Sequence, residues 1–209
     1  MNLVQINEIF LRFQRQNPKP VTELKYKNEY TLLVAIVLSA QATDISVNKA
    51  TEILFEDITC PEQMINLGEE KLQNYIKSIG LYRTKAQNII KLSQILQDQY
   101  HNYIPDTLED LMSLPGVGRK TANVFLNCAR GANTIGVDTH VLRVSNRLGF
   151  TESLNPFVVE KDLELLIPIE WKKYAHHWLI LHGRYTCKAR KPLCKNCYLT
   201  DLCKSFKVR

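Results

Sequence analysis

Apolar residues recur at the spacing of an α-helix along nearly the whole chain, and this period constrains the fold more than any other feature. No convincing run of alternating polar and apolar residues indicates a strand. The segment 30–40 is long and contains alanine, which favours a fully buried helix. Further helices are expected over residues 3–13, 44–55, 69–78, 84–100, 107–113, 120–129, 139–148, 157–166 and 171–182. The sequence therefore predicts an all-α protein.

The composition is that of an ordinary globular protein, with 45% hydrophobic and 23% charged residues among 209. This balance excludes a mainly disordered chain. The longest apolar run, residues 30–40, is far shorter than the roughly 20 residues needed to cross a bilayer. The first ten residues lack the basic and apolar regions of a signal peptide. We therefore expect a soluble cytoplasmic protein with no membrane partner.

The net charge of +6 is concentrated at the C-terminal end. Eight basic residues and one acidic residue lie between Arg184 and Arg209, so this tail carries +7 and the preceding residues carry −1. A positive patch of this kind usually binds a polyanion such as nucleic acid. The alternative is a basic tail that only improves solubility.

Four of the six cysteines lie inside this tail, in the pattern C-x6-C-x2-C-x5-C: Cys187, Cys194, Cys197 and Cys203. An exported disulfide scaffold does not fit a chain of this size without a signal peptide. Structural zinc usually uses two close pairs of ligands separated by a longer loop. Four thiolates from one compact loop suit an iron–sulfur cluster better, and zinc remains the alternative. The isolated Cys60 and Cys128 are expected to be small buried residues.

The segment 111–127 predicts two helices joined by a tight turn. Pro115 ends the first helix, and Gly116 and Gly118 lack the Cβ that hinders a positive φ. The second helix begins at once, so its first backbone N–H groups point outward and form a seat for a phosphate group. Such a seat reads the DNA backbone and not its sequence. The alternative is an ordinary turn between two helices.

Lys120 lies in the first turn of this second helix and has Arg119 as its neighbour. The helix dipole and the neighbouring charge both favour the neutral, nucleophilic form of its amine. A phosphate contact, or a merely solvated lysine, is the alternative. Asp138 is a candidate carboxylate partner, although it also fits the N-cap position of the helix that follows.

Five segments together resemble the endonuclease III family of bacterial DNA repair enzymes. They are LSAQATD (38–44), IGLYRTKAQNI (79–89), LPGVGRKTAN (114–123), GVDTH (136–140) and HGRYTC (182–187), the last followed by the cysteine pattern. The similarity runs in the same order over nearly the whole chain. It implies two helical domains with DNA in the cleft between them. A six-helix barrel over 22–132 would carry the helix–hairpin–helix at about 107–130. Residues 1–21 and 133–209 would form the cluster domain, with its loop at 187–203.

The resemblance also implies the activity. Members remove oxidised pyrimidines from double-stranded DNA and then cut the strand at the abasic site. Lys120 matches the nucleophilic lysine of the family, and Asp138 matches its essential aspartate. The four cysteines match the ligands of a [4Fe–4S] cluster. A monomer associated with the bacterial nucleoid is expected.

Further DNA contacts are expected around these groups. Leu81 is a candidate wedge that fills the gap left by an extruded base, and Gln41 is a candidate contact to the orphaned partner base. Gly116, Gly118 and Arg119 would hold phosphate in the hairpin. Lys188, Arg190 and Lys191 would bind phosphate from the six-residue arm between Cys187 and Cys194. Three alternatives remain: an adenine glycosylase, a pyrimidine-dimer glycosylase, or a non-catalytic iron–sulfur module that binds DNA or senses redox state.

Overall fold

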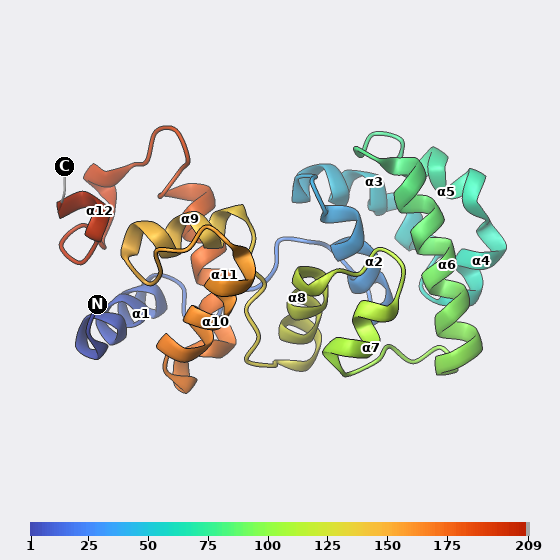
Figure 1. Ribbon diagram of the computed structural model, residues 1–209. Coiled ribbons are helices and arrows are strands. Elements are labelled where there is room, and N and C mark those ends of the chain that lie inside the picture. The colour runs from blue at the N-terminus through green and yellow to red at the C-terminus, as the bar shows by residue number, and fades with distance from the viewer. Residues whose placement is uncertain (208–209) are drawn as a thin grey trace. The chain divides into compact units, whose positions relative to one another are not determined.

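The computed structural model describes residues 1–207 and is all-helical over that range, which confirms the predicted fold class (Figure 1). Arg209, the last residue of the basic tail, lies outside the described residues. The chain divides into two compact units: Glu23–Arg130 is one, and Met1–Thr22 combines with the chain from Gly131 onward to form the other. In the described part of the chain, no helix is both long enough and apolar enough to cross a membrane.

The Glu23–Arg130 unit is built around a helix that is buried on all sides. Its helices are α2 (Glu29–Ser39), α3 (Asp44–Asp57), α4 (Pro61–Leu67), α5 (Glu69–Ile76), α6 (Tyr82–Tyr100), α7 (Leu108–Ser113) and α8 (Arg119–Arg130). Nine consecutive residues of α2, from Tyr30 to Leu38, are buried, as its uniform apolar sequence predicts. Helices α3, α6 and α8 pack around it.

Helix α4 is the one helix of this unit that was not expected from the sequence. Pro61 occupies its first turn, where the missing N–H is not needed, and Gly68 ends it with a φ of 80°. Only Pro61 and Met64 are buried among its seven residues. With only these two buried residues, α4 shows no helical period of apolar side chains in the sequence.

The other unit has a core that draws on both ends of the chain. Its helices are α1 (Leu3–Gln16), α9 (Thr139–Leu148), α10 (Pro156–Leu166), α11 (Ile169–Tyr185), the 3-10 turn η1 (Cys194–Asn196) and α12 (Lys204–Lys207). Phe10 and Phe13 of α1 pack against Trp178 of α11, with ring centroids 6.1 and 6.2 Å away. The Trp178 indole N–H donates to the carbonyl of Asn17 at 2.8 Å, so the end of α1 is fixed to α11.

Candidate functional site

The hairpin between α7 and α8 contains one glycine that the backbone requires. Gly116 adopts a φ of 80°, whereas Gly118 does not adopt a positive φ, so the expectation that both glycines relieve the turn is wrong for Gly118. The turn needs only one left-handed residue because Gly118 already starts the helical bonding, its carbonyl accepting from the N–H of Ala122 at 3.0 Å. A Cβ at Gly116 would lie 3.1 Å from Cβ of Asn88 and 3.3 Å from Cγ1 of Val37. The hairpin therefore packs closely on α6 and α2.

The outer side of the same turn is open. A Cβ at Gly118 would meet nothing within 4 Å, and Gly118 is exposed. The first N–H groups of α8 have no acceptor within the helix. Arg119 and Lys120 are the first two residues of α8, and Lys120 is exposed. The structure thus presents an exposed amine beside an unobstructed helix start.

Asp138 is the N-cap of α9, in the other unit from Lys120. One carboxylate oxygen, Oδ1, accepts the backbone N–H groups of His140 and Val141, each at 2.8 Å. No hydrogen bond involves the second oxygen, Oδ2, in the described part of the chain. The cap interpretation is confirmed, and one oxygen is left for other chemistry.

Gln41 and Leu81 share an uncommon backbone conformation. Gln41 lies in the turn between α2 and α3 with a φ of 54°, and Leu81 is the N-cap of α6 with a φ of 59°. The left-handed region costs a non-glycine residue roughly 1–2 kcal/mol. Both residues are exposed, and Leu81 is 63% accessible although its side chain is apolar. Both residues are therefore accessible from solvent.

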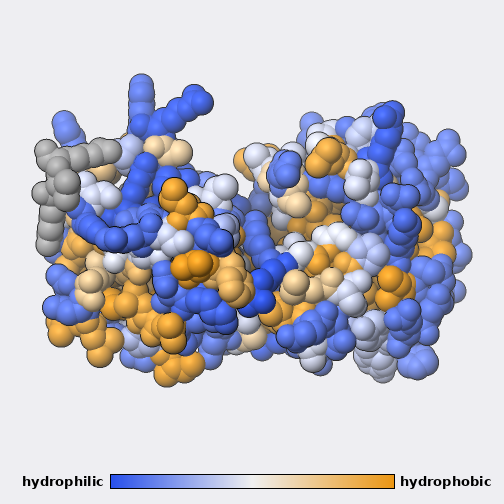
Figure 2. Space-filling model, viewed as in Figure 1, coloured by the Kyte–Doolittle hydropathy of each residue, from blue (hydrophilic) through white to orange (hydrophobic). Residues whose placement is uncertain are grey.

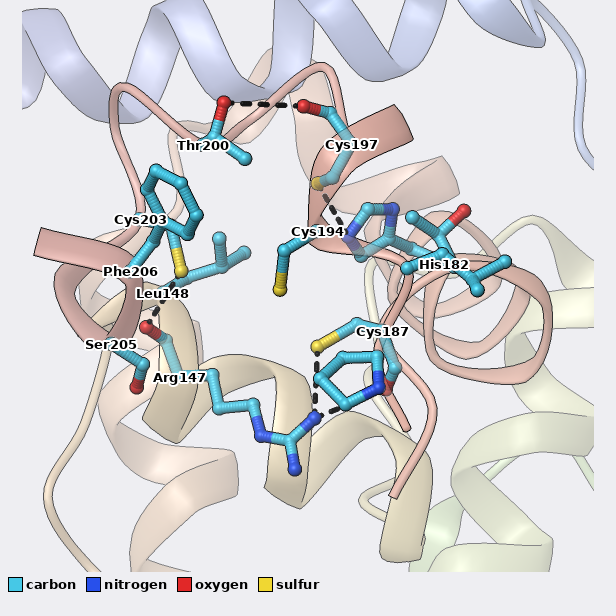
Figure 3. Close-up of a pocket in the computed structure, with 13 residues that line it drawn as sticks. Arg147, Leu148, His182, Cys187, Cys194, Cys197, Thr200, Cys203, Ser205 and Phe206 are labelled. Carbon is cyan, nitrogen blue, oxygen red and sulfur yellow. Dashed lines mark hydrogen bonds between the residues drawn. The ribbon is translucent and has the colours of Figure 1, made fainter. Parts of the chain in front are cut away.

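The four cysteines of the C-terminal loop line one pocket, and their sulfur atoms face into it (Figure 3). Cys187 follows α11, Cys194 is the first residue of η1, Cys197 directly follows η1, and Cys203 precedes α12. The pocket wall also includes Arg147 and His182, and among the described residues no Asp or Glu lines it. In residues 1–207, no group of three or more His, Cys, Asp or Glu side chains is placed to hold a single metal ion.

The cysteine sulfur atoms of this pocket take part in hydrogen bonds, and burial affects the pKa of two of their thiols. Arg147 Nη1 donates to Sγ of Cys187 at 3.4 Å, and Sγ of Cys203 donates to the carbonyl of Arg147 at 3.3 Å. Burial raises the pKa of the Cys197 and Cys203 thiols. It also lowers the pKa of His182, whose Nε2 lies 3.8 Å from Sγ of Cys197, to about 4. Binding a metal group here would therefore release thiol protons.

Two arginines of α9 fix the base of the six-residue arm. Arg147 donates to the carbonyls of Lys188 at 2.8 Å and Ala189 at 2.9 Å. Arg143 donates to the carbonyl of Cys187 at 3.1 Å. Neither arginine was expected from the sequence, where their i, i+4 spacing on one helix is the available signal.

The arm itself extends into solvent. The side chains of Lys188, Arg190 and Lys191 are all exposed. Figure 2 shows hydrophilic side chains projecting from the surface at the place of this loop in Figure 1. A fixed backbone with exposed cations suits a polyanionic partner.

Comparisons with known proteins give a consistent answer. Residues 34–168 match the family described as HhH-GPD superfamily base excision DNA repair protein. The chain is 56% identical to endonuclease III of Rickettsia prowazekii over 201 residues, 96% of this chain and 95% of that protein. It is 52% identical to endonuclease III of Escherichia coli over 97% of this chain and 96% of that protein.

A solved structure extends the similarity to three dimensions. A trapped endonuclease III–DNA covalent intermediate, described as an estranged-adenine complex, superposes with a TM-score of 0.93 at 46% identity, over 100% of this chain and 99% of that one. The resemblance seen in the sequence motifs is thereby confirmed over the full length. The chain therefore belongs to the endonuclease III family of DNA glycosylase/AP lyases, within the HhH-GPD superfamily of base excision DNA repair proteins.

Proposed function

We propose that this enzyme removes oxidised pyrimidines from double-stranded DNA and then cuts the strand on the 3′ side of the abasic site, with Lys120 as the nucleophile. The observation that carries the proposal is the exposed amine of Lys120 in the first turn of α8, beside the open face of Gly118. The 46% identical structure of a trapped covalent complex with DNA supports a covalent step in the same fold.

The chemistry begins with a damaged nucleotide extruded from the stack. The neutral Lys120 Nζ attacks C1′ of the deoxyribose, a C–N bond forms, and the bond to the base breaks as the base leaves with its electron pair. Loss of the amine proton and ring opening give a Schiff base. That imine acidifies the C2′ proton, and its removal expels the 3′ phosphate by β-elimination. The enzyme is regenerated when water releases the imine.

Asp138 is proposed to act through the carboxylate oxygen that the cap does not use. Oδ1 is committed to α9 by two hydrogen bonds, so the side chain cannot rotate freely. A fixed carboxylate can stabilise positive charge that develops on the sugar, or accept the proton of the attacking amine. Either role needs the negative charge and not only the shape of the side chain.

Contacts to the DNA backbone and to the gap complete the proposed interface. The N–H groups at the start of α8, with Gly116, Gly118 and Arg119, would hold a phosphate. Leu81 would fill the space of the extruded base, and Gln41 would face the orphaned partner. The estranged adenine named in the description of the related complex supports such an orphaned base.

The pocket of Cys187, Cys194, Cys197 and Cys203 fits the proposed [4Fe–4S] cluster. Its donors are four sulfurs, with no carboxylate among the described lining residues, and sulfur is the soft donor that iron–sulfur clusters use. Arg147 beside Cys187 would offset part of the negative charge of the thiolates. When bound, the cluster supplies structural order to the loop, and no step of the reaction passes through it. Lys188, Arg190 and Lys191 would then bind phosphates from a fixed arm.

The domain roles follow from these assignments. We propose that Glu23–Arg130 is the domain that carries the hairpin and that the other unit is the cluster domain, with DNA bound by both. The enzyme is proposed to act as a monomer on DNA of the bacterial nucleoid.

The substrate assignment is tested with three 30-mer duplexes that carry thymine glycol, a cyclobutane pyrimidine dimer, or adenine opposite 8-oxoguanine. Excision and strand cutting only of the thymine glycol duplex are expected. Faster excision of adenine or of the dimer supports one of the two rival glycosylases instead. Binding without excision of any of the three supports the non-catalytic module.

A further inference from the structure

Lys85 of α6 is a buried lysine that no part of the proposed reaction uses. Only 6% of it is exposed, and lysine is almost never buried to this degree without a partner. Its Nζ donates to the carbonyls of Leu38 at 2.9 Å and Ala40 at 2.7 Å. Both carbonyls belong to the C-terminal end of α2, where the helix dipole is negative. Within the described residues no carboxylate pairs with Lys85, so backbone carbonyls alone balance its charge.

The position of these carbonyls shows which two segments the Lys85 side chain connects. Ala40 directly precedes Gln41, so the ammonium group fixes the backbone that enters the Gln41 turn. The backbone N–H of Lys85 donates to the carbonyl of Leu81 at 3.0 Å, which places Lys85 in the first turn of α6. One side chain therefore connects the Gln41 turn to the helix start that carries Leu81.

Both connected turns are strained. Gln41 and Leu81 each hold a left-handed backbone, with φ of 54° and 59°. Such conformations persist only where the surrounding structure enforces them. Burial lowers the pKa of Lys85, so its desolvation is a cost that the two carbonyl contacts offset. An apolar side chain would fill the same space without that cost and without fixing the turn.

The hairpin contacts the same face of α6. Asn88 follows Lys85 by three residues, and a Cβ at Gly116 would meet Asn88 at 3.1 Å. Residues 81, 85 and 88 have the spacing of one helical face. The Leu81 turn, the Gln41 turn and the hairpin are thus all positioned by one stripe of α6.

We propose that Lys85 is a positioning residue that holds the Gln41 turn at a fixed distance from the Leu81 turn, so that both side chains enter the DNA duplex together. This inference rests on the proposed function of Gln41 and Leu81. Lys85 touches neither the DNA nor the reacting atoms, and its effect is limited to steps in which the gap in the duplex must be filled.

The test compares Lys85→Met with Lys91→Met, which removes an exposed lysine from the same helix. Single-turnover excision of thymine glycol is measured in a fully paired duplex and in a duplex whose opposite strand has a one-nucleotide gap at the lesion. The gapped duplex has no partner base opposite the lesion, so no partner base has to be displaced. Lys85→Met is expected to slow excision in the paired duplex by about tenfold to a hundredfold, as misplaced contacts do, and to affect the gapped duplex much less. Lys91→Met is expected to leave both rates unchanged.

A second readout follows the partner base directly. 2-Aminopurine is placed opposite a tetrahydrofuran abasic analogue, and its fluorescence change at saturating enzyme reports displacement of the partner base. Lys85→Met is expected to reduce this change as Leu81→Ala does, and the double variant is expected to resemble Leu81→Ala alone. If Lys85→Met fails to fold, Lys85→Arg provides the same test, because a longer guanidinium keeps the charge but displaces the turn.

The possible outcomes separate the inference from the function on which it rests. If Gln41→Ala and Leu81→Ala alter the paired rate and the fluorescence but the Lys85 variants do not, the positioning role is wrong. Equal losses of the paired and gapped rates in the Lys85 variants also overturn it, since they indicate general support of the fold. If Gln41→Ala and Leu81→Ala change neither readout, the proposed role of the two turns is wrong.

Discussion

Asp138 and Val141 are joined by a hydrogen bond of 2.8 Å, in which the backbone N–H of Val141 donates to Oδ1 of the carboxylate. The same oxygen also accepts the N–H of His140. The start of α9 and the orientation of the carboxylate therefore depend on each other. Because only Oδ1 takes part, the structural and the proposed chemical roles of Asp138 can be separated by substitution.

Asp138→Asn is expected to keep the helix cap and lose the reaction. Asparagine caps helices as well as aspartate does, so the free energy of unfolding should stay within about 0.5 kcal/mol, whereas Asp138→Ala should lose about 1 kcal/mol. Urea denaturation measures the cap, and single-turnover strand cutting measures the chemistry. Both variants should cut slowly. Cutting by Asp138→Asn at the wild-type rate contradicts a role for the negative charge.

Lys120→Gln is expected to bind lesion DNA but to form no covalent adduct. Lys120 is exposed, so the fold should be unaffected, and the affinity should fall modestly with the lost charge. Borohydride trapping on a duplex with an abasic site gives the measurement. Arg119→Gln is the matched control, because it removes the neighbouring charge and keeps the amine; it should still be trapped. If Lys120→Gln is trapped as efficiently as the wild-type enzyme, another amine carries out the reaction.

Gly116→Ala and Gly118→Ala are expected to differ sharply in stability. Alanine at position 116 must adopt a φ of 80° and meet Asn88 at 3.1 Å, which should lower the free energy of unfolding by about 1–3 kcal/mol. Alanine at position 118 meets nothing within 4 Å, so its effect should stay within about 0.5 kcal/mol. Denaturant titration of both proteins compares them. A similar loss at both positions contradicts the distinction.

Cys197→Ser is expected to abolish or strongly reduce cluster loading. Protein purified without oxygen should be yellow-brown and contain about four iron and four sulfide per chain, on the resemblance to the family. The variant should lose this absorbance, unfold more readily in its C-terminal loop and bind DNA more weakly. Cys60→Ser, at a cysteine outside the pocket, is the control and should keep its iron. One colourless zinc per chain in the wild type refutes the cluster.

Changing Arg190 and Lys191 together to alanine is expected to weaken binding to damaged and undamaged DNA alike. Each cation that neutralises a phosphate contributes about 0.9 to the salt slope, so the slope should flatten by about one to two units. Binding isotherms at several salt concentrations give this value. Lys71→Ala with Lys77→Ala removes the same charge from exposed positions on and just beyond α5 and should change the slope less. If the double variant loses binding to damaged DNA but keeps binding to undamaged DNA, the arm recognises the damage and not the backbone.

The sequence was most informative where a local signal determines the structure. Thr139–Leu148 forms α9 with the predicted bounds, because Asp138 supplies a cap at one end and Gly149 a left-handed stop at the other. The long apolar run with alanine over residues 30–40 predicts helix α2, with bounds shifted by one residue from those observed. Turn details are not encoded locally, since Gly116 differs from Gly118 in its φ of 80° and in its packing against Asn88, and neither difference is marked in the sequence.

Contacts between segments that are distant in the chain have no recognisable pattern in the amino-acid sequence. Lys85 binds carbonyls more than 40 residues earlier, and Arg147 binds carbonyls about 40 residues later. A carbonyl acceptor is present at every residue, so no side chain marks its partner in the sequence. The burial of a lysine can be recognised only once the helices are assembled.

The joint core of α1 and α11 has a consequence for the order of events during synthesis. The buried face of α1, formed by Ile6, Ile9, Phe10 and Phe13, leaves the ribosome first, but the partners that cover it lie between Ile135 and Leu199. At about 5–20 residues per second, the intervening segment takes on the order of ten seconds to appear. The contiguous Glu23–Arg130 unit can fold in that interval, while α1 exposes its apolar face to chaperones. A fragment that starts at Gly131 lacks the part of its hydrophobic core that α1 supplies. Residues 1–22 must be added as a separate peptide to complete that core.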